Sequence, residues 1–337
     1  MMDEAIETGS DRNYGATPPP GENGLAPGFV MERTTLANIG EIRPLFERLF
    51  GRAPAPGILR LKYTTPFHPG SVFLGHLVRN AEGLVVGHYG AILQKFRAAR
   101  RVVLVGQGCE VMALPGRRHA GMFQALGRAT DQALANAGAE CCIGFANEAS
   151  RAALVKRLGW TAPYALRGFR IPVSTVPIAA MARRVGLERA WLAWACRRLE
   201  SLRAPDQILP GSARDDEGGG ALRDADHYAY RRFSVNTVIE IRGVRAWVKV
   251  DRSLVIGEIE RVDESRVLDL LNGLRRVARG LGLTEILFHA SPRAWSTEIL
   301  EKHFPGFESW TLVYKVYQAS SIDPARLRLT AGDVDTF

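Results

Sequence analysis

The segment Glu110-Val-Met-Ala-Leu114-Pro-Gly-Arg-Arg-His-Ala-Gly121-Met-Phe123 decides the fold. Its first five residues have the composition of a strand. A short turn with two glycines and two arginines then leads into a helix, which we predict over residues 121–137, with Gly138 ending it. The first turn of a helix leaves backbone N–H groups unpaired, so such a turn points donors at an anion. The segment therefore predicts a strand, a pyrophosphate-binding turn and a helix.

Regular elements surround this segment on both sides. Residue periodicities predict, in order, a helix within residues 35–50, strands at 72–79, 84–94 and 101–114, the helix at 121–137, a strand at 140–146, a helix at 149–158 and a strand at 166–171. The residues between the first two strands are those of a hairpin turn. This order of elements predicts an α/β layer with a mixed sheet.

The second half of the chain repeats this plan in outline. It has strand patterns at 245–250 and 253–259, a helix pattern at 265–281, a buried strand at 284–289 and a helix at 293–304. We favour a duplicated domain over a chance match. The stretch before the second helix, residues 260–265, is acidic and would repel a phosphate. Only the first copy is therefore expected to hold the anion, so we expect one cofactor per chain.

These patterns divide the chain into four parts. Residues 1–30 are rich in glycine and proline and predict a disordered tail. Residues 31–172 form the anion-binding domain, 173–222 a linker helix with a flexible loop, and 223–337 a second, degenerate domain. The helix at 173–202 has apolar and arginine-rich sides, which fits a membrane-surface helix or a linker helix packed on a domain. We favour the packed linker.

The composition of the chain limits the classes of partner that it is expected to bind. The chain has 337 residues and a net charge of +9, which suits nucleic acid, an anionic membrane or an anionic metabolite. Its arginines are dispersed and no helix-turn-helix stands out, so we favour the metabolite and expect no nucleic acid and no membrane insertion. No signal peptide or spanning segment is recognisable, which predicts a cytoplasmic protein. The four cysteines have the spacing of neither a disulfide framework nor a zinc site, and no metal is expected: Cys109, Cys141, Cys142 and Cys196.

The turn resembles a known signature. Arg118-His-Ala-Gly121-Met-Phe123 is similar to the acyl-CoA signature of the GNAT acyltransferases, and residues 145–160, ending in Gly159-Trp160, resemble the family's next motif. The direct resemblance covers residues 35–171. It implies two tandem GNAT-like domains, each a mixed, largely antiparallel sheet flanked by helices, and acetyl-CoA or another acyl-CoA as co-substrate.

The resemblance also assigns cofactor-binding residues. Met112 and Leu114 would bond the pantetheine amides, and Asn147, with Ser150 beside it, would reach the pantetheine arm. Phe123 stands where the family usually has glycine or alanine, so the helix would approach the phosphates differently. The residues implied to wrap the pyrophosphate are Arg117, Arg118, His119, Ala120, Gly121, Met122 and Phe123.

Amide formation from a thioester needs a base, an oxyanion donor and often an acid. Glu110 stands where the family often places a carboxylate base, although it could equally pair with an arginine. His88 is a further candidate, but it alternates with Tyr89, so only one of the two faces the ligand. The family's tyrosine acid would fall near Val155, which leaves Tyr164 as the nearest substitute, or a thiolate that departs unassisted.

The acceptor is a separate question. The resemblance extends to bacterial acyltransferases that acylate the amino group of a nucleotide-linked sugar, and to tandem enzymes that modify aminoglycosides or amino acids. The positive net charge favours an anionic acceptor. We therefore expect a nucleotide-linked amino sugar in surface polysaccharide biosynthesis. A non-catalytic acyl-CoA-binding or partner-binding protein is the alternative. Residues 330–337 are polar and acidic, and would be a frayed tail or a segment that folds back on the acceptor amine.

Overall fold

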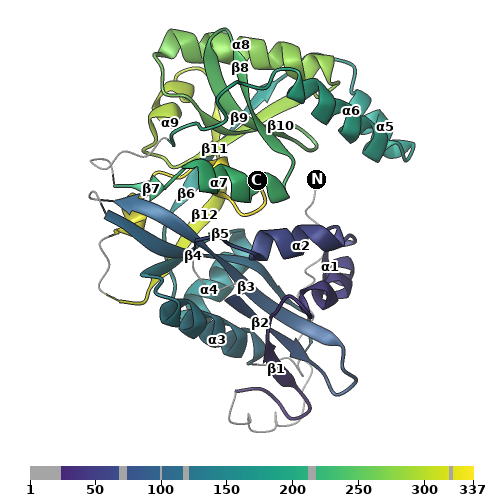
Figure 1. Cartoon of the computed structure of the whole chain (residues 1–337), viewed down its shortest axis with the longest axis vertical. Helices are drawn as coiled ribbons and strands as arrows, with labels where there is room; N and C mark the ends of the chain where they lie inside the picture. The colour runs from purple at the N-terminus through teal and green to yellow at the C-terminus, as the bar shows by residue number, and fades with distance from the viewer. Residues whose placement is uncertain (1–23, 68–73, 99–100, 117–120, 212–217, 319–321) are drawn as a thin grey trace.

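One mixed sheet runs through the molecule (Figure 1). The computed structural model describes residues 24–67, 74–98, 101–116, 121–211, 218–318 and 322–337. The main strands follow the order β1-β2-β3-β4-β5-β12-β6-β11-β10-β9-β8, and the short β7 pairs with β3. Antiparallel pairing dominates; the parallel pairs are β4 with β5 and β10 with β11. The expected fold class, a mixed and largely antiparallel sheet flanked by helices, is confirmed.

The first half builds one end of this sheet. Helices α1 and α2 cover one face, where Leu45 and Leu59 pack against Leu77. Helices α3 and α4 cover the other, where Met122 packs with Val78. The elements are β1 (Val30–Arg33), η1 (Ile39–Ile42), α1 (Arg43–Phe50), α2 (Pro56–Tyr63), β2 (Leu74–Arg79), β3 (Val85–Ala98), β4 (Arg101–Ala113), α3 (Met122–Asn136), β5 (Cys141–Ala146), α4 (Glu148–Leu158) and β6 (Thr161–Pro172).

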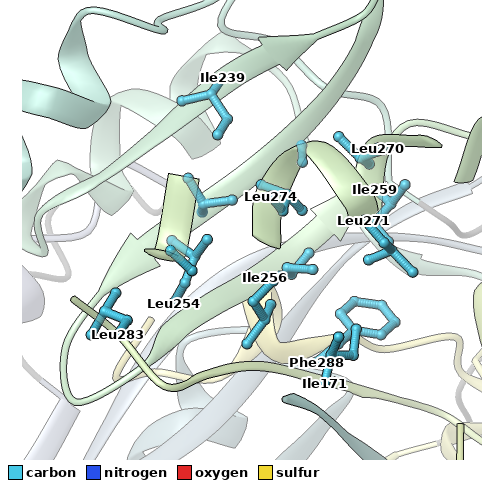
Figure 2. Packing of buried hydrophobic residues seen from close by; sticks show 14 of the residues in the cluster. Ile171, Ile239, Leu254, Ile256, Ile259, Leu270, Leu271, Leu274, Leu283 and Phe288 are labelled. Carbon is cyan, nitrogen blue, oxygen red and sulfur yellow. The ribbon is translucent and has the colours of Figure 1, made fainter. Parts of the chain in front are cut away.

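The second half builds the other end around its own core. Figure 2 shows Leu270 and Leu274 of α8 packed over Ile239, Ile256 and Phe288 of the strands. The elements are α5 (Ile178–Arg184), α6 (Glu188–Glu200), β7 (Gly220–Ala221), α7 (Ala225–Tyr230), η4 (Arg231–Phe233), β8 (Asn236–Ile241), β9 (Val244–Val250), β10 (Leu254–Ile259), α8 (Glu264–Gly280), β11 (Glu285–Ala290), α9 (Trp295–Leu300), β12 (Gly306–Val316), η5 (Pro324–Arg326) and η6 (Ala331–Asp333).

The two halves exchange their last strands. β12, from the second half, lies between β5 and β6, and β6, from the first half, lies between β12 and β11. Each half otherwise has the same order: antiparallel strands, a helix, a parallel strand, a helix and the exchanged strand. The predicted domains 31–172 and 223–337 therefore share the middle of one sheet.

Several predicted boundaries change. The expected tail at residues 1–30 is ordered from Gly24 onward in the part of the chain that the structure describes, because Leu25 is buried in the core beneath α3 and Val30 begins β1. The expected flexible loop ends early, because Gly220–Ala221 pairs with β3 and Arg223 is buried. The remaining parts of that tail and loop, residues 1–23 and 212–217, lie outside the described residues.

The segment expected as a linker helix is two helices packed on the second half. Trp191, Ala195 and Leu199 of α6 are buried in that core, and the Trp191 indole N–H donates to the Leu281 carbonyl at 3.0 Å. Within the described residues, no helix is long and apolar enough to cross a membrane.

Candidate active site

A pocket opens where β4 and β5 separate. Their parallel pairing ends at Gln107 and Ile143, and the residues that follow on both strands line a pocket of about 210 Å³. Glu110 has a left-handed backbone (φ 45°) at the register shift between β3 and β4. Such a bulge bends a strand, here next to the opening of the pocket. The pocket is lined by Tyr89, Gly108, Cys109, Glu110, Val111, Gly144, Phe145, Ala146, Asn147, Ser150, Leu154, Trp160 and Asp335.

A buried ion network holds Glu110. One carboxylate oxygen pairs with the Lys62 ammonium and the other accepts from the Tyr63 hydroxyl at 2.6 Å. Lys62 also pairs with Asp335 at 2.6 Å. Burial alone would raise the pKa of Glu110, but the Lys62 ammonium outweighs it and the pKa is lowered. Burial would likewise lower the pKa of Lys62, but Asp335 and Glu110 raise it. Glu110 and Lys62 are therefore both charged at neutral pH.

Tyr63 reaches Glu110 because the strand beside it carries a glycine. A Cβ on Gly90 would overlap the Tyr63 hydroxyl, so only glycine allows this approach. The Cys109 thiol donates to the same hydroxyl at 3.4 Å, and burial raises the pKa of Cys109 well above its ordinary value. The thiol is thus protonated at neutral pH and is a poor nucleophile.

The same cluster has the spacing of a metal site. The ligand atoms of Cys109, Glu110 and Asp335 all lie within 4.8 Å of one another. Lys62, however, already pairs with both carboxylates. Each carboxylate thus has one oxygen held by the ammonium, and the Cys109 thiol is protonated, so the three groups do not offer the free, deprotonated ligands that a metal needs.

His88 and Tyr89 take opposite faces of β3, and Tyr89 is the one that lines the pocket. His88 is fully buried, and its Nδ1 lies 2.9 Å from the Glu110 carbonyl, to which it donates. Burial lowers the pKa of His88 to about 4, so the ring stays neutral. The predicted catalytic His88 therefore supports the bulge backbone instead of facing the ligand.

Met112 and Leu114 direct their backbone groups away from the pocket. The Leu114 N–H donates to the Val86 carbonyl of β3 at 2.9 Å, and Met112, two residues earlier on the same strand, faces the same neighbour. Because successive amides of a strand point to opposite edges, the amides expected at the open edge are those of Val111 and Ala113. The expected pantetheine-binding pair, Met112 and Leu114, is therefore displaced by one residue. The bulge at Glu110 sets which of the successive amides face the pocket.

Part of the predicted pyrophosphate turn can be placed. Arg117, Arg118, His119 and Ala120 lie outside the described residues. Gly121 has φ 83°, and a Cβ there would lie 2.8 Å from the Gly24 carbonyl oxygen. Met122 is buried against Gly87, and Phe123 stacks on Tyr89 with ring centroids 6.5 Å apart. Phe123 is thus held by an aromatic pocket residue.

Asn147 and Ser150 stand at the start of α4 and both line the pocket. The Asn147 side-chain oxygen accepts from the Ser150 backbone N–H at 2.9 Å and from its hydroxyl at 2.8 Å. This is an N-cap, which orients the helix end toward the pocket. The structure therefore places Glu110, Asn147 and Ser150 in the wall of one pocket.

Tyr164 lies elsewhere, on β6. Its hydroxyl donates to the Leu327 carbonyl at 2.7 Å and lies 3.1 Å from the Ser291 hydroxyl. Burial raises the pKa of Tyr164 to about 12. It does not line the pocket that holds Glu110, so this candidate acid is not brought to the other site residues.

Residues 329–337 connect the two halves at the site. In the second half, β10 and β11 stop pairing at Ile256 and Phe288, and there Thr330 bridges Ala290 while Phe337 packs on Gly257. The segment occupies the place that corresponds to the pocket of the first half. It then delivers Asp335 into the first pocket. In the described residues, the second half is thus filled by the chain itself at the place where the first half has its pocket.

The fold is similar to solved acyltransferase structures. No protein-family model and no curated protein matches the sequence. A conserved protein of unknown function from Enterococcus faecalis V583, described as a probable N-acyltransferase, has a TM-score of 0.55 at 10% identity, covering 87% of this chain and 74% of that chain. The GCN5-related N-acetyltransferase from Kribbella flavida has a TM-score of 0.53 at 14% identity, covering 87% of this chain and 73% of that chain. The one from Anabaena variabilis ATCC 29413 has a TM-score of 0.53 at 12% identity, covering 87% and 74%. The chain has the fold of these GNAT proteins across both halves.

Proposed function

We propose that this protein is an acyl-CoA-dependent N-acyltransferase that transfers an acetyl or other short acyl group to a primary amine. One observation carries the proposal: β4 and β5 separate beside a buried, ionised carboxylate, Glu110, on a fold shared with N-acetyltransferases. The backbone amides of Val111 and Ala113 and the capped start of α4 would bind the pantetheine arm. The N-terminus of α3 would receive the pyrophosphate.

The pocket residues account for the chemistry. Glu110 takes a proton from the acceptor ammonium, and the freed amine attacks the thioester carbonyl. The carbon–nitrogen bond forms, the carbon–sulfur bond breaks, and the coenzyme A thiolate leaves; the nitrogen loses its second proton and the thiolate takes one up, which gives the neutral amide and the thiol. Glu110 can accept the proton because it is ionised, and a carboxylate offers about four lone-pair sites, of which Lys62 and Tyr63 take two.

The pocket favours a cationic acceptor. Its described lining carries two carboxylates, Glu110 and Asp335, and no basic side chain, while Lys62 offsets only one of the two charges. A protonated amine suits this field and a diphosphate does not. We therefore favour a polycationic or amino acid amine over the nucleotide-linked amino sugar and the role in surface polysaccharide that the net charge suggested.

The test is acetyl-CoA binding followed by turnover. We expect calorimetry to show stoichiometric binding of acetyl-CoA, and thiol release to be faster with an aminoglycoside or an amino acid than with a UDP-linked amino sugar. Binding without thiol release for any amine would favour the non-catalytic alternative. A chain that does not bind acetyl-CoA would refute the proposal altogether.

Tyr89 is the proton donor that the pocket offers to the leaving thiolate. Its hydroxyl lies next to Gly108 in the pocket wall, and burial raises its pKa well above the ordinary value, so it stays protonated. Tyr89→Phe should lower kcat about 10²-fold with little change in acetyl-CoA affinity. Tyr317→Phe removes a partly buried hydroxyl, bonded to Asp131 outside the pocket, and should not change kcat. Equal kcat values for the two variants would exclude Tyr89 as the acid.

Lys62→Met should shift the pH dependence of kcat/KM. Without Lys62, burial and the nearby Asp335 carboxylate raise the pKa of Glu110 above its ordinary value. The base works only when ionised, so the rate should fall as the pH drops through this higher pKa, and the acidic limb should move toward neutral pH. Lys315→Met, which removes a more exposed lysine paired with Asp131, is the matched control. An unshifted acidic limb in Lys62→Met would mean that Glu110 is not the base.

A further inference from the structure

Large apolar side chains are exposed along α5 and its flanks. Val176, Ile178, Met181, Val185 and Leu187, which we call the α5 patch, are between 43 and 68% exposed. Soluble proteins expose single apolar residues everywhere, but a contiguous run of them marks a binding surface. Five such residues within twelve positions require an explanation.

The helix is oriented with its larger side chains outward. Ile178, Met181 and Val185 follow the spacing i, i+3, i+7 and form one stripe. Ala179 is buried in the core of the second half, and Ala182 is partly buried against it. A helix that served only to cover the core would place its large side chains inward. Here the small alanines make the contact with the core, and the large residues are left for a partner.

Arginines surround the stripe. Residues 173–202 hold five arginines against two glutamates, and one of these glutamates, Glu188, pairs with Arg183 at 3.0 Å. Arg184 and Arg189 are exposed next to the stripe, as are Arg197 and Arg198 along α6. Figure 1 shows α6 and then α5 extending to one edge of the molecule, with α5 outermost. The stripe can therefore meet a flat surface.

We propose that the α5 patch docks this protein on an anionic phospholipid bilayer. The apolar stripe would enter the boundary between headgroups and acyl chains, and Arg184 and Arg189 would contact lipid phosphates. A second copy of the chain fits less well. A two-fold interface would bring the arginines of both copies together, and interface cores are depleted in charge. The bilayer supplies both the apolar layer and the negative charge that the patch lacks.

Vesicle binding tests the proposal with the full chain. The protein should cosediment with vesicles of phosphatidylcholine mixed with phosphatidylglycerol, bind poorly to phosphatidylcholine alone, and be released by salt. Met181→Ser with Val185→Ser should weaken binding about tenfold or more. Arg184→Gln should weaken it about fivefold, the effect of one basic side chain near an anionic surface. These readouts do not depend on acyl transfer.

Matched variants in the first half of the chain complete the design. Val30→Ser on β1 removes a similarly exposed valine and Arg52→Gln a similarly exposed arginine, and both should bind vesicles like the wild type. If these controls lose as much binding as the α5 variants, the attraction comes from the overall net charge and the docking site is refuted. A dimer in sedimentation equilibrium that Met181→Ser with Val185→Ser dissociates, without vesicle binding by the wild type, would identify a second copy as the occupant instead.

Discussion

Glu110→Gln should lower kcat for acyl transfer by about 10²–10⁴-fold, the usual contribution of a positioned general base. The amide has nearly the shape of the carboxylate and can still accept the 2.6 Å hydrogen bond from Tyr63, but it cannot take a proton from the acceptor. Affinity for acetyl-CoA should stay unchanged, because in the proposed binding mode the pantetheine arm contacts the amides of Val111 and Ala113 and not the Glu110 side chain. Thiol release at saturating acetyl-CoA, together with calorimetric binding, measures both quantities.

Two further variants make this result specific. Glu285→Gln changes a partly exposed strand glutamate that pairs with Arg170 far from the pocket, and its kcat should match the wild type. Cys109→Ala removes the buried thiol beside Glu110 and should keep kcat within the same order of magnitude, because a protonated thiol cannot carry the acyl group. A complete loss of turnover in Cys109→Ala with full turnover in Glu110→Gln would replace direct transfer by an acyl-enzyme mechanism.

The fold could be predicted wherever the signal was local. The helix at 121–137 and the strand at 140–146 are found as α3 and β5 within one residue at each end, because apolar periodicity and a terminal glycine mark them. Helix α2 was not predicted: the first helix was expected to end by residue 50, and the prolines that follow are typical of a helix stop, whereas Pro56 begins a new helix. The exchange of β6 and β12 has no local signal, since it depends on which edge of the sheet each last strand meets.

The candidate site, like the fold, could be predicted only where a short stretch of sequence carried the signal. Glu110 was a candidate because the resembled family often places a carboxylate at that position, but Lys62 and Asp335 lie 273 positions apart and are joined only by the tertiary fold. The choice between His88 and Tyr89 was correctly limited to one of two faces. The bulge at Glu110 sets the register of the strand, and it could not be predicted, because a left-handed backbone is unusual for glutamate and no residue type in that strand indicates it.

Arg223→Met should lower the free energy of unfolding by about 3–5 kcal/mol. Arg223 donates to Glu258 at 2.6 Å and to Asp333 at 2.8 Å, and all three side chains are 2% exposed or less. It therefore ties β10 to the segment that fills the second half and delivers Asp335 to the pocket. Removing it leaves two carboxylates buried together without their cation. Urea denaturation of the two proteins at neutral pH measures the loss.

The pH dependence of that loss distinguishes charge from packing. With Arg223 gone, one of the two buried carboxyl groups must take up a proton on folding, so the variant should recover stability relative to the wild type as the pH falls from about 7 to about 5. A loss that is the same at both pH values would indicate missing packing against Trp247 instead. Arg245→Met is the matched control, because Arg245 also joins two carboxylates, Asp206 and Glu260, but at the surface. There water replaces the arginine, and the loss should be about 1 kcal/mol or less.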